Sequence, residues 1–237
     1  MPAIKKTKLV CFDLDGTLTK DIHSVMFLCI LNMNLEKLLE IERQEASGKL
    51  HWIEADYQKA KLIKGLAESE IKIGFDKILQ PLKNITPVVD ALRQNDIQSI
   101  VVTAGPIQVA RAAKEKWGLD GFYGSDYEVI NGIFTGRILS HMGDTGKIAC
   151  LKDYCERNKI ESTGCVAVGD GISDISLFEY CQTSIAINYS PAVAGKATYY
   201  LNTNDLFDIT RHIPGFIVPG KTMGGENDYP ILAFLPP

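Results

Sequence analysis

Apolar and polar positions along the chain predict strands that alternate with helices. The run TKLVCF at 7–12 is short and apolar, and it leads into DLDGT, where Gly16 allows a sharp turn. From residue 82 onward, similar short runs alternate with stretches whose apolar residues recur every three or four positions. Strands joined by helices form a mostly parallel sheet covered on both faces. The elements predicted after residue 82 are strands at 99–103, 165–168, 184–187 and 198–201, helices at 88–95, 107–117, after Asp144 and at 172–180, and a hairpin turning at Asn131-Gly132.

The segment 21–81 departs from this alternation. Apolar spacings of three and four recur through LNMNLEKLLEIERQEASGKL and WIEADYQKAKLIKGL, and no run there favours a strand. We therefore predict an α/β core, residues 1–20 and 82–213, with a helical cap, 21–81, inserted after the first strand. The Gly- and Pro-rich tail, 214–237, is expected to be an extended arm that packs on the domain or on a neighbouring subunit.

Composition limits the class of protein and its location. The 237 residues are 46% hydrophobic and 23% charged, enough to bury a sizeable core. A net charge of −4 provides no broad basic field, so we expect no nucleic-acid partner.

The longest apolar stretch, 25–33, is shorter than the roughly 20 residues that cross a bilayer, and the N-terminus has no signal-peptide core, so we expect neither membrane insertion nor secretion. Six cysteines without a C-x-x-C pair are typical of a reducing compartment, and we expect a cytoplasmic protein.

Polar side chains follow the predicted strands or begin a predicted helix. Ligands of an open parallel sheet bind beyond the carboxyl ends of its strands, so these side chains are expected to converge. Taken singly, an Asp-x-Asp pair or a Gly-Asp-Gly is more often turn chemistry, and a lone lysine at a helix start is more often solvated. Their combination and order favour a site for a hard cation and a phosphate. The candidates are Asp13, Asp15, Thr103, Ala104, Gly105, Lys147, Asp170 and Asp174.

The two aspartates after the first strand have complementary predicted roles. Asp13 can attack phosphorus, because a carboxylate nucleophile divides one hard displacement into two easier steps through an aspartyl phosphate. Asp15, two residues on, faces the same side. It can protonate the leaving alkoxide and then deprotonate the water of the second step.

The other candidates suit a cation and a phosphoryl group. Mg²⁺ prefers an octahedral shell of oxygen ligands. Asp13, Asp170 and the backbone carbonyl of Asp15 can share the ion with a phosphate oxygen, and Asp174 can assist directly or through water. The donors expected to accommodate the phosphoryl charge are the Thr103 hydroxyl, the backbone N–H groups of Ala104 and Gly105, and the Lys147 ammonium.

These motifs resemble a known family. DLDGT at 13–17, VVTAG at 101–105, Lys147 and GDGISD at 169–174 are similar to the four ordered motifs of the haloacid dehalogenase-like hydrolases. Within that superfamily the layout is similar to phosphoserine phosphatases, with a helical segment between the first two motifs. The resemblance implies a Rossmann-like doubly wound parallel sheet, an inserted α-helical cap of the C1 type, Mg²⁺, and an aspartyl-phosphate intermediate. It also implies the same residue roles, with Asp13 as nucleophile.

Departures from the phosphoserine phosphatase pattern bear on the substrate. That group uses a glutamate shortly after the first motif to hold the substrate ammonium, and a cap arginine to hold its carboxylate. Here Ile22 and Lys59 stand at those positions, and Asp21 and His23 flank the missing acid and could partly substitute for it. Isoleucine cannot pair with an ammonium group, and lysine is a poorer bidentate partner than arginine. We expect the substrate to be a small phosphorylated metabolite other than phosphoserine.

Histidines are candidates for a separate role. His23 lies ten residues after Asp13 and can titrate near neutrality, but a hydrogen-bonded histidine at the start of the cap explains it as well. His51, His141 and His212 have no carboxylate or cysteine partner at the spacing of a metal site, and we expect them to be structural.

Other functions fit the same motifs. Phosphotransfer to a small alcohol in place of water leaves every motif residue unchanged, and adding acceptor alcohols separates it from hydrolysis. A haloacid dehalogenase proper needs no Mg²⁺, and Asp15 and the GDGISD loop argue against it. A non-catalytic binding protein on this fold is the third alternative, since fold alone does not prove activity. The chain is expected to be a monomer or a homodimer.

Overall fold

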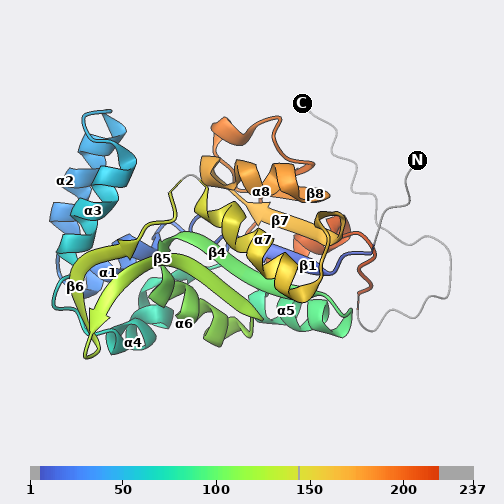
Figure 1. The fold of residues 1–237 in the computed structure, drawn as a ribbon, viewed down its shortest axis with the longest axis horizontal. Helices are drawn as coiled ribbons and strands as arrows, with labels where there is room; N and C mark the ends of the chain where they lie inside the picture. Colours follow the sequence, from blue (N-terminus) through green and yellow to red (C-terminus); the bar gives the residue numbers. More distant parts are fainter. Residues whose placement is uncertain (1–5, 144, 219–237) are drawn as a thin grey trace.

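The computed structural model describes residues 6–143 and 145–218. Within them, a central sheet has seven strands in the order β6-β5-β4-β1-β7-β8-β9, and a second sheet pairs β2 with β3 (Figure 1). All neighbours in the central sheet are parallel except β6, which pairs antiparallel with β5 at one edge. The strands are β1 (Leu9–Phe12), β2 (Thr19–Lys20), β3 (Gln80–Pro81), β4 (Gln98–Pro106), β5 (Gly121–Ile130), β6 (Ile133–Ser140), β7 (Cys165–Gly169), β8 (Thr183–Ile187) and β9 (Tyr199–Leu201).

Helices cover both faces of this sheet, as Figure 1 shows for α5 and α6 on one side and α7 and α8 on the other. The α-helices are α1 (Ser24–Leu31), α2 (Leu35–Ala46), α3 (Trp52–Leu62), α4 (Ser69–Ile78), α5 (Ile85–Gln94), α6 (Ile107–Trp117), α7 (Gly146–Asn158) and α8 (Ile175–Tyr180). Short 3₁₀ turns are η1 (Ser162–Gly164), η2 (Ile172–Asp174), η3 (Pro191–Val193) and η4 (Leu206–His212). The predicted α/β fold with a doubly wound parallel sheet is therefore confirmed.

Strand β1 shows why the central strands are continuously apolar. Side chains alternate between the two faces of a strand, and both faces of a parallel sheet are covered. Val10 and Phe12 pack in the apolar cluster that includes residues of α5 and α6, whereas Leu9 and Cys11 pack in the cluster that includes residues of α7 and α8. All four side chains are fully buried, so no side chain of this strand is exposed to solvent.

Several predicted boundaries shift in the structure. Helix α5 begins at Ile85, before Pro87, because a proline in the first helical turn lacks only an N–H that would have no partner there. The predicted helix 172–180 divides into η2 and α8. The hairpin turn matches its prediction: Asn131 and Gly132 both have positive φ, as a two-residue turn of the favoured hand requires.

Four helices, α1 to α4, occupy the segment predicted as a cap, and β2 and β3 pair where the chain enters and leaves it. That two-residue ladder was not predicted, because runs so short carry no periodicity. Figure 1 shows α2 and α3 projecting together from the end of the sheet. The apolar cluster of α5 and α6 also contains cap residues such as Phe27 and Ile71, so cap and sheet share one core. The division into domains at 21 and 81 stays a prediction.

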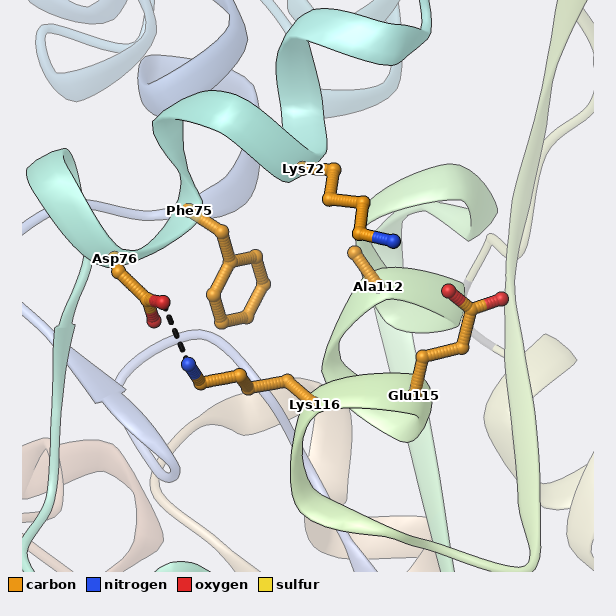
Figure 2. A pocket seen from close by; sticks show the side chains of 6 residues that line it. All are labelled: Lys72, Phe75, Asp76, Ala112, Glu115 and Lys116. Carbon is orange, nitrogen blue, oxygen red and sulfur yellow. Dashed lines mark hydrogen bonds and ion pairs between the residues drawn. The ribbon is translucent and has the colours of Figure 1, made fainter.

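Helix α4 is attached to the sheet domain through α6. A pocket of about 360 Å³ lies between these helices. Figure 2 shows the Phe75 ring on its wall and the ion pair between Lys116 and Asp76 beside it. Phe75 also packs edge-on against Trp117, with ring centroids 5.5 Å apart. This pocket shares no residue with the acidic site described below.

The first residues of the predicted tail pack on the domain. Pro214 O accepts a hydrogen bond from Thr7 N, and Ile217 exchanges two hydrogen bonds with the side chain of Asn95. Residues 219–237 of the predicted tail lie outside the described residues. Among the helices of the described part, none is long and apolar enough to cross a membrane.

Candidate active site

Carboxylates meet at the carboxyl ends of β1 and β7. These strands are neighbours in the sheet, and the Asp13 N–H continues their ladder by donating to Val168 O at 2.9 Å. The chain after β1 leads to β4 on one side, and the chain after β7 leads to β8 on the other. The ends of β1 and β7 therefore flank a topological switch point, where open α/β sheets bind ligands. Asp13 and Asp170, which directly follow these two strands, are thereby brought together.

Lys147 bridges two of the carboxylates. It is the second residue of α7, and its Nζ donates to Asp13 Oδ1 at 2.7 Å and to Asp174 Oδ1 at 2.8 Å. None of the three side chains is more than 5% exposed. Burial acts to lower the pKa of Lys147, but the neighbouring Asp13 and Asp174 carboxylates outweigh it and raise that pKa above its usual range. The lysine therefore stays an ammonium group.

The surroundings of Asp13 disfavour its ionised form. Burial and then the Asp174 carboxylate raise the pKa of Asp13 well above its ordinary value, and Lys147 only partly offsets them. Asp170 behaves similarly, since burial and Asp174 raise its pKa to about 6. The three carboxylates thus repel one another at neutral pH, and a cation beside them would relieve that repulsion.

Asp174 is held by the turn that follows β7. Its Oδ2 accepts the backbone N–H groups of Asp170 at 3.0 Å and of Gly171 at 3.1 Å. Asp170 in turn accepts a hydrogen bond from Thr17 Oγ1 at 3.3 Å, which connects the loop after β7 to the loop after β1. Both acidic side chains are therefore oriented before any ligand arrives.

The donor set fits a divalent cation. One carboxylate oxygen from each of Asp13, Asp170 and Asp174 lies within 4.8 Å of the others. When all three are ionised, the carboxylates and the single Lys147 ammonium sum to two net negative charges, which a divalent ion would neutralise. Because every donor is a carboxylate oxygen, a hard ion such as Mg²⁺ suits the site better than a soft metal does.

Asp15 faces a different set of partners. Its Oδ1 accepts the backbone N–H of Ser24 at 2.7 Å, and its Oδ2 accepts the Ser24 hydroxyl at 2.5 Å. The Thr103 hydroxyl lies 3.4 Å from the same Oδ2 and accepts the Gly105 N–H at 3.0 Å. Ser24 was not predicted as a site residue, although a serine directly before the apolar run 25–33 is a helix-start signal.

Ala104, a further predicted phosphate ligand, is held in place through its backbone carbonyl. Ala104 O accepts the Ser125 hydroxyl at 2.6 Å, so the end of β4 is held against β5. Residues 103–105 form the last part of β4, beside Asp15, where the register with β5 shifts between Val102 and Pro106. Of the predicted phosphate ligands, Thr103 thus lies beside Asp15, whereas Lys147 lies between Asp13 and Asp174.

The four residues predicted to affect specificity have different surroundings. Asp21 is exposed, with φ of +59°, and Ile22 is half-buried against the apolar core. His23 begins α1, where its Nδ1 accepts the Met26 N–H at 3.2 Å. Its Nε2 lies 2.7 Å from Glu42 Oε1, on α2. His23 is thus hydrogen-bonded at the start of α1 and to α2, and its part in specificity stays a prediction.

Lys59 is also engaged within the cap. This buried side chain on α3 donates to Glu45 Oε2 at 2.7 Å and to Asp56 Oδ1 at 3.4 Å. Asp56 Oδ2 lies 3.0 Å from His141 Nε2, so a histidine that follows β6 reaches the cap. This acidic partner of His141 was not predicted, because it lies 85 residues away in the chain.

Comparisons with known proteins agree with this arrangement. A family model described as haloacid dehalogenase-like hydrolase matches residues 10–179. The phosphoserine phosphatase of Idiomarina loihiensis is 27% identical over 203 residues, covering 85% of this chain and 91% of that protein. The phosphoserine phosphatase of Methanocaldococcus jannaschii is 27% identical over 216 residues, covering 88% of this chain and 99% of that protein.

Solved structures share the fold. A phospho-aspartyl intermediate analogue of phosphoserine phosphatase superposes with a TM-score of 0.75 at 26% identity, covering 88% of this chain and 100% of that one. A hydrolase from Salmonella enterica serovar Typhi has a TM-score of 0.81 at 18% identity, covering 93% of this chain and 74% of that one, and at this identity it supports the fold alone.

Proposed function

The chain belongs to the haloacid dehalogenase-like hydrolase family, and we propose that it is a Mg²⁺-dependent phosphatase that hydrolyses a small phosphomonoester through an aspartyl phosphate on Asp13. The observation that carries this proposal is the bridge from Lys147 to Asp13 and Asp174 at the switch point of the sheet. A buried ammonium group beside a nucleophilic carboxylate suits the transfer of a phosphoryl group, whose charge it stabilises.

The first step transfers the phosphoryl group to the protein. A carboxylate oxygen of Asp13 attacks phosphorus, the bond from phosphorus to the ester oxygen breaks, and Asp15 gives its proton to that oxygen. The leaving group departs as an alcohol. In the second step water attacks phosphorus, its proton moves to Asp15, and the bond from phosphorus to Asp13 breaks. The two steps return both aspartates to their starting state.

The remaining residues bind charge. In this proposal the Lys147 ammonium, the Thr103 hydroxyl and the backbone N–H groups of Ala104 and Gly105 bind the phosphoryl oxygens. Asp13, Asp170 and Asp174 are the side chains that would hold Mg²⁺, with the Asp15 carbonyl as a further ligand. Bound there, Mg²⁺ withdraws charge from the phosphoryl group and lowers its repulsion with the nucleophile.

We propose that the substrate is not phosphoserine, although the relatives of this chain carry that name. Lys59 stands where that group has an arginine for the substrate carboxylate. Its ammonium group is already paired with Glu45 and Asp56. Ile22, at the position of the ammonium-binding glutamate, packs against the apolar core. The two contacts that select phosphoserine therefore have no equivalent at these positions.

A panel of phosphomonoesters tests the proposal. Phosphate release is measured from phosphoserine, phosphoethanolamine, phosphocholine, sugar phosphates and p-nitrophenyl phosphate, with Mg²⁺ or with EDTA. We expect release with Mg²⁺ only, from a few members, and weak release from phosphoserine. Turnover that persists in EDTA would favour a dehalogenase-type site, and product formed on added alcohols would favour phosphotransfer.

Two variants make this assay specific. Asp13→Asn removes the nucleophile with almost no change in volume, and we expect it to lower kcat by about 10³-fold or more. Asp126→Asn is the matched control, because Asp126 is exposed on β5 and outside the site. Full activity in Asp13→Asn would contradict the proposed mechanism, and silence of the wild-type protein across the panel would contradict the proposed activity.

We also propose that the enzyme acts in the cytoplasm. The six cysteines are all free thiols, although Cys155 Sγ and Cys165 Sγ are only 3.5 Å apart. Thiols so close to each other stay reduced in a reducing compartment.

A further inference from the structure

Ser24 makes a two-point contact with Asp15. Its backbone N–H donates to Oδ1 at 2.7 Å and its hydroxyl donates to Oδ2 at 2.5 Å, so a single residue binds both oxygens of the carboxylate. Two parallel hydrogen bonds restrict the orientation of a carboxylate far more than one bond does. Ser24 is the first residue of α1, so this contact joins the cap to the loop after β1.

Ser24 itself is fixed in place. Its side chain is fully buried. On its other side the hydroxyl lies so close to Gly105 that a Cβ at that position would be 2.1 Å from Oγ. Because Gly105 has no Cβ, Ser24 fits between Asp15 and the last part of β4. The backbone turn of α1 is held in addition by His23, which accepts the Met26 N–H.

The contacts leave one position of Asp15 for a proton. A carboxylate oxygen accepts two hydrogen bonds. Oδ2 is approached by the hydroxyls of Ser24 and Thr103, whereas Oδ1 accepts only the Ser24 N–H among the contacts of the described residues. The second acceptor position of Oδ1 is thus the one that stays open for proton transfer.

We propose that Ser24 is a positioning residue, which holds Asp15 in the orientation that delivers its proton to the leaving group. The proposal rests on the proposed function, because it needs Asp15 to act as the general acid. The proton moves from Oδ1 of Asp15 to the ester oxygen as the bond from that oxygen to phosphorus breaks, and water returns it in the second step. Because Ser24 belongs to the cap, the position of α1 determines whether this acid is aligned.

A matched pair of substrates tests the proposal in the full chain with Mg²⁺. Phenyl phosphate and p-nitrophenyl phosphate have nearly the same shape, but p-nitrophenolate leaves readily without a proton whereas phenolate benefits from one. The value of kcat/KM reports the steps up to loss of the leaving group. We expect Ser24→Ala to lower kcat/KM about 10- to 100-fold for phenyl phosphate and less than about threefold for p-nitrophenyl phosphate.

Ser69→Ala is the matched control. Ser69 is also the first residue of a cap helix, α4, but it is exposed and makes no contact with Asp15. We expect it to leave both substrates unaffected. Thermal unfolding of each variant establishes that the protein is folded at the assay temperature.

A double variant separates positioning from packing. In Asp15→Asn the acid is absent, so adding Ser24→Ala should leave the ratio of the two kcat/KM values unchanged. Equal losses on both substrates in Ser24→Ala, or no loss on either, would overturn the positioning role while the proposed function stands. A wild-type protein that hydrolyses neither substrate would instead overturn the proposed function and this inference with it.

Discussion

The ammonium group of Lys147 donates to the carboxylate of Asp13 across 2.7 Å, although the two residues are 134 positions apart in the chain. Both are buried, and the same ammonium group also reaches Asp174. Burial limits the solvation of these groups by water, so each charge depends on the others. The pair is thereby both part of the proposed chemistry and a condition for the stability of the site.

Loss of Lys147 is expected to destabilise the metal-free protein. Lys147→Met leaves Asp13 and Asp174 buried without their cation, and removing one partner of a buried ion pair costs about 3–5 kcal/mol. Urea unfolding in EDTA measures the free energy of unfolding. Lys152→Met, at an exposed position of the same helix, is the control and is expected to change it little. Equal stability of the two variants would show that the bridge contributes nothing.

Mg²⁺ is expected to stabilise the wild-type protein against unfolding. A ligand that binds only the folded state at 100 times its Kd adds about 2.7 kcal/mol to the free energy of unfolding. Asp170→Ala removes one proposed ligand and should abolish most of this gain, whereas Asp126→Asn should keep it. Thermal unfolding with Mg²⁺ and with EDTA makes the comparison, and an equal gain in Asp170→Ala would place the ion elsewhere.

The hydrogen bond between His23 and Glu42 predicts a pH dependence of stability. The hydrogen bond from His23 lowers the pKa of Glu42 below its ordinary value of 4.5. A carboxyl whose pKa is lower when folded contributes stability that is fully present above pH 4.5 and is lost as the pH falls through the folded pKa. Wild type should therefore lose its advantage over Glu42→Gln on acidification. The difference between their free energies of unfolding, measured from pH 7 downward, should shrink. A constant difference would contradict the prediction.

Lys59 is expected to stabilise the cap and to have little part in binding. Lys59→Met removes a buried ammonium group and leaves the partly exposed carboxylates of Glu45 and Asp56 without it. We expect it to lower the free energy of unfolding by about 1–3 kcal/mol. In Lys59→Met, the KM for the preferred substrate should change by a smaller factor than kcat/KM changes in Asp13→Asn. Measuring unfolding and KM on the same preparation checks both parts, and a KM raised by more than about tenfold with stability unchanged would assign Lys59 to the substrate.

The sequence by itself determined the fold class and the members of the acidic site. Short apolar runs alternating with helical periodicity lead to a parallel sheet, and carboxyl ends of neighbouring parallel strands lie at one edge. The positions of Asp13 and Asp170 after such runs were therefore enough to predict that they meet. Local chemistry also determined the hairpin at Asn131 and Gly132, since both residues adopt positive φ readily.

Only the tertiary structure decided which side chains pair. Ser24 reaches Asp15 because α1 begins beside the end of β4, and His141 reaches Asp56 because β6 lies against α3. Periodicity specifies the face of a helix or strand, but the partner across a gap depends on strand order, helix placement and side-chain length together. A buried polar group must be satisfied by whatever the fold brings within about 3 Å, and that distance is a property of the packed chain, which no local pattern encodes.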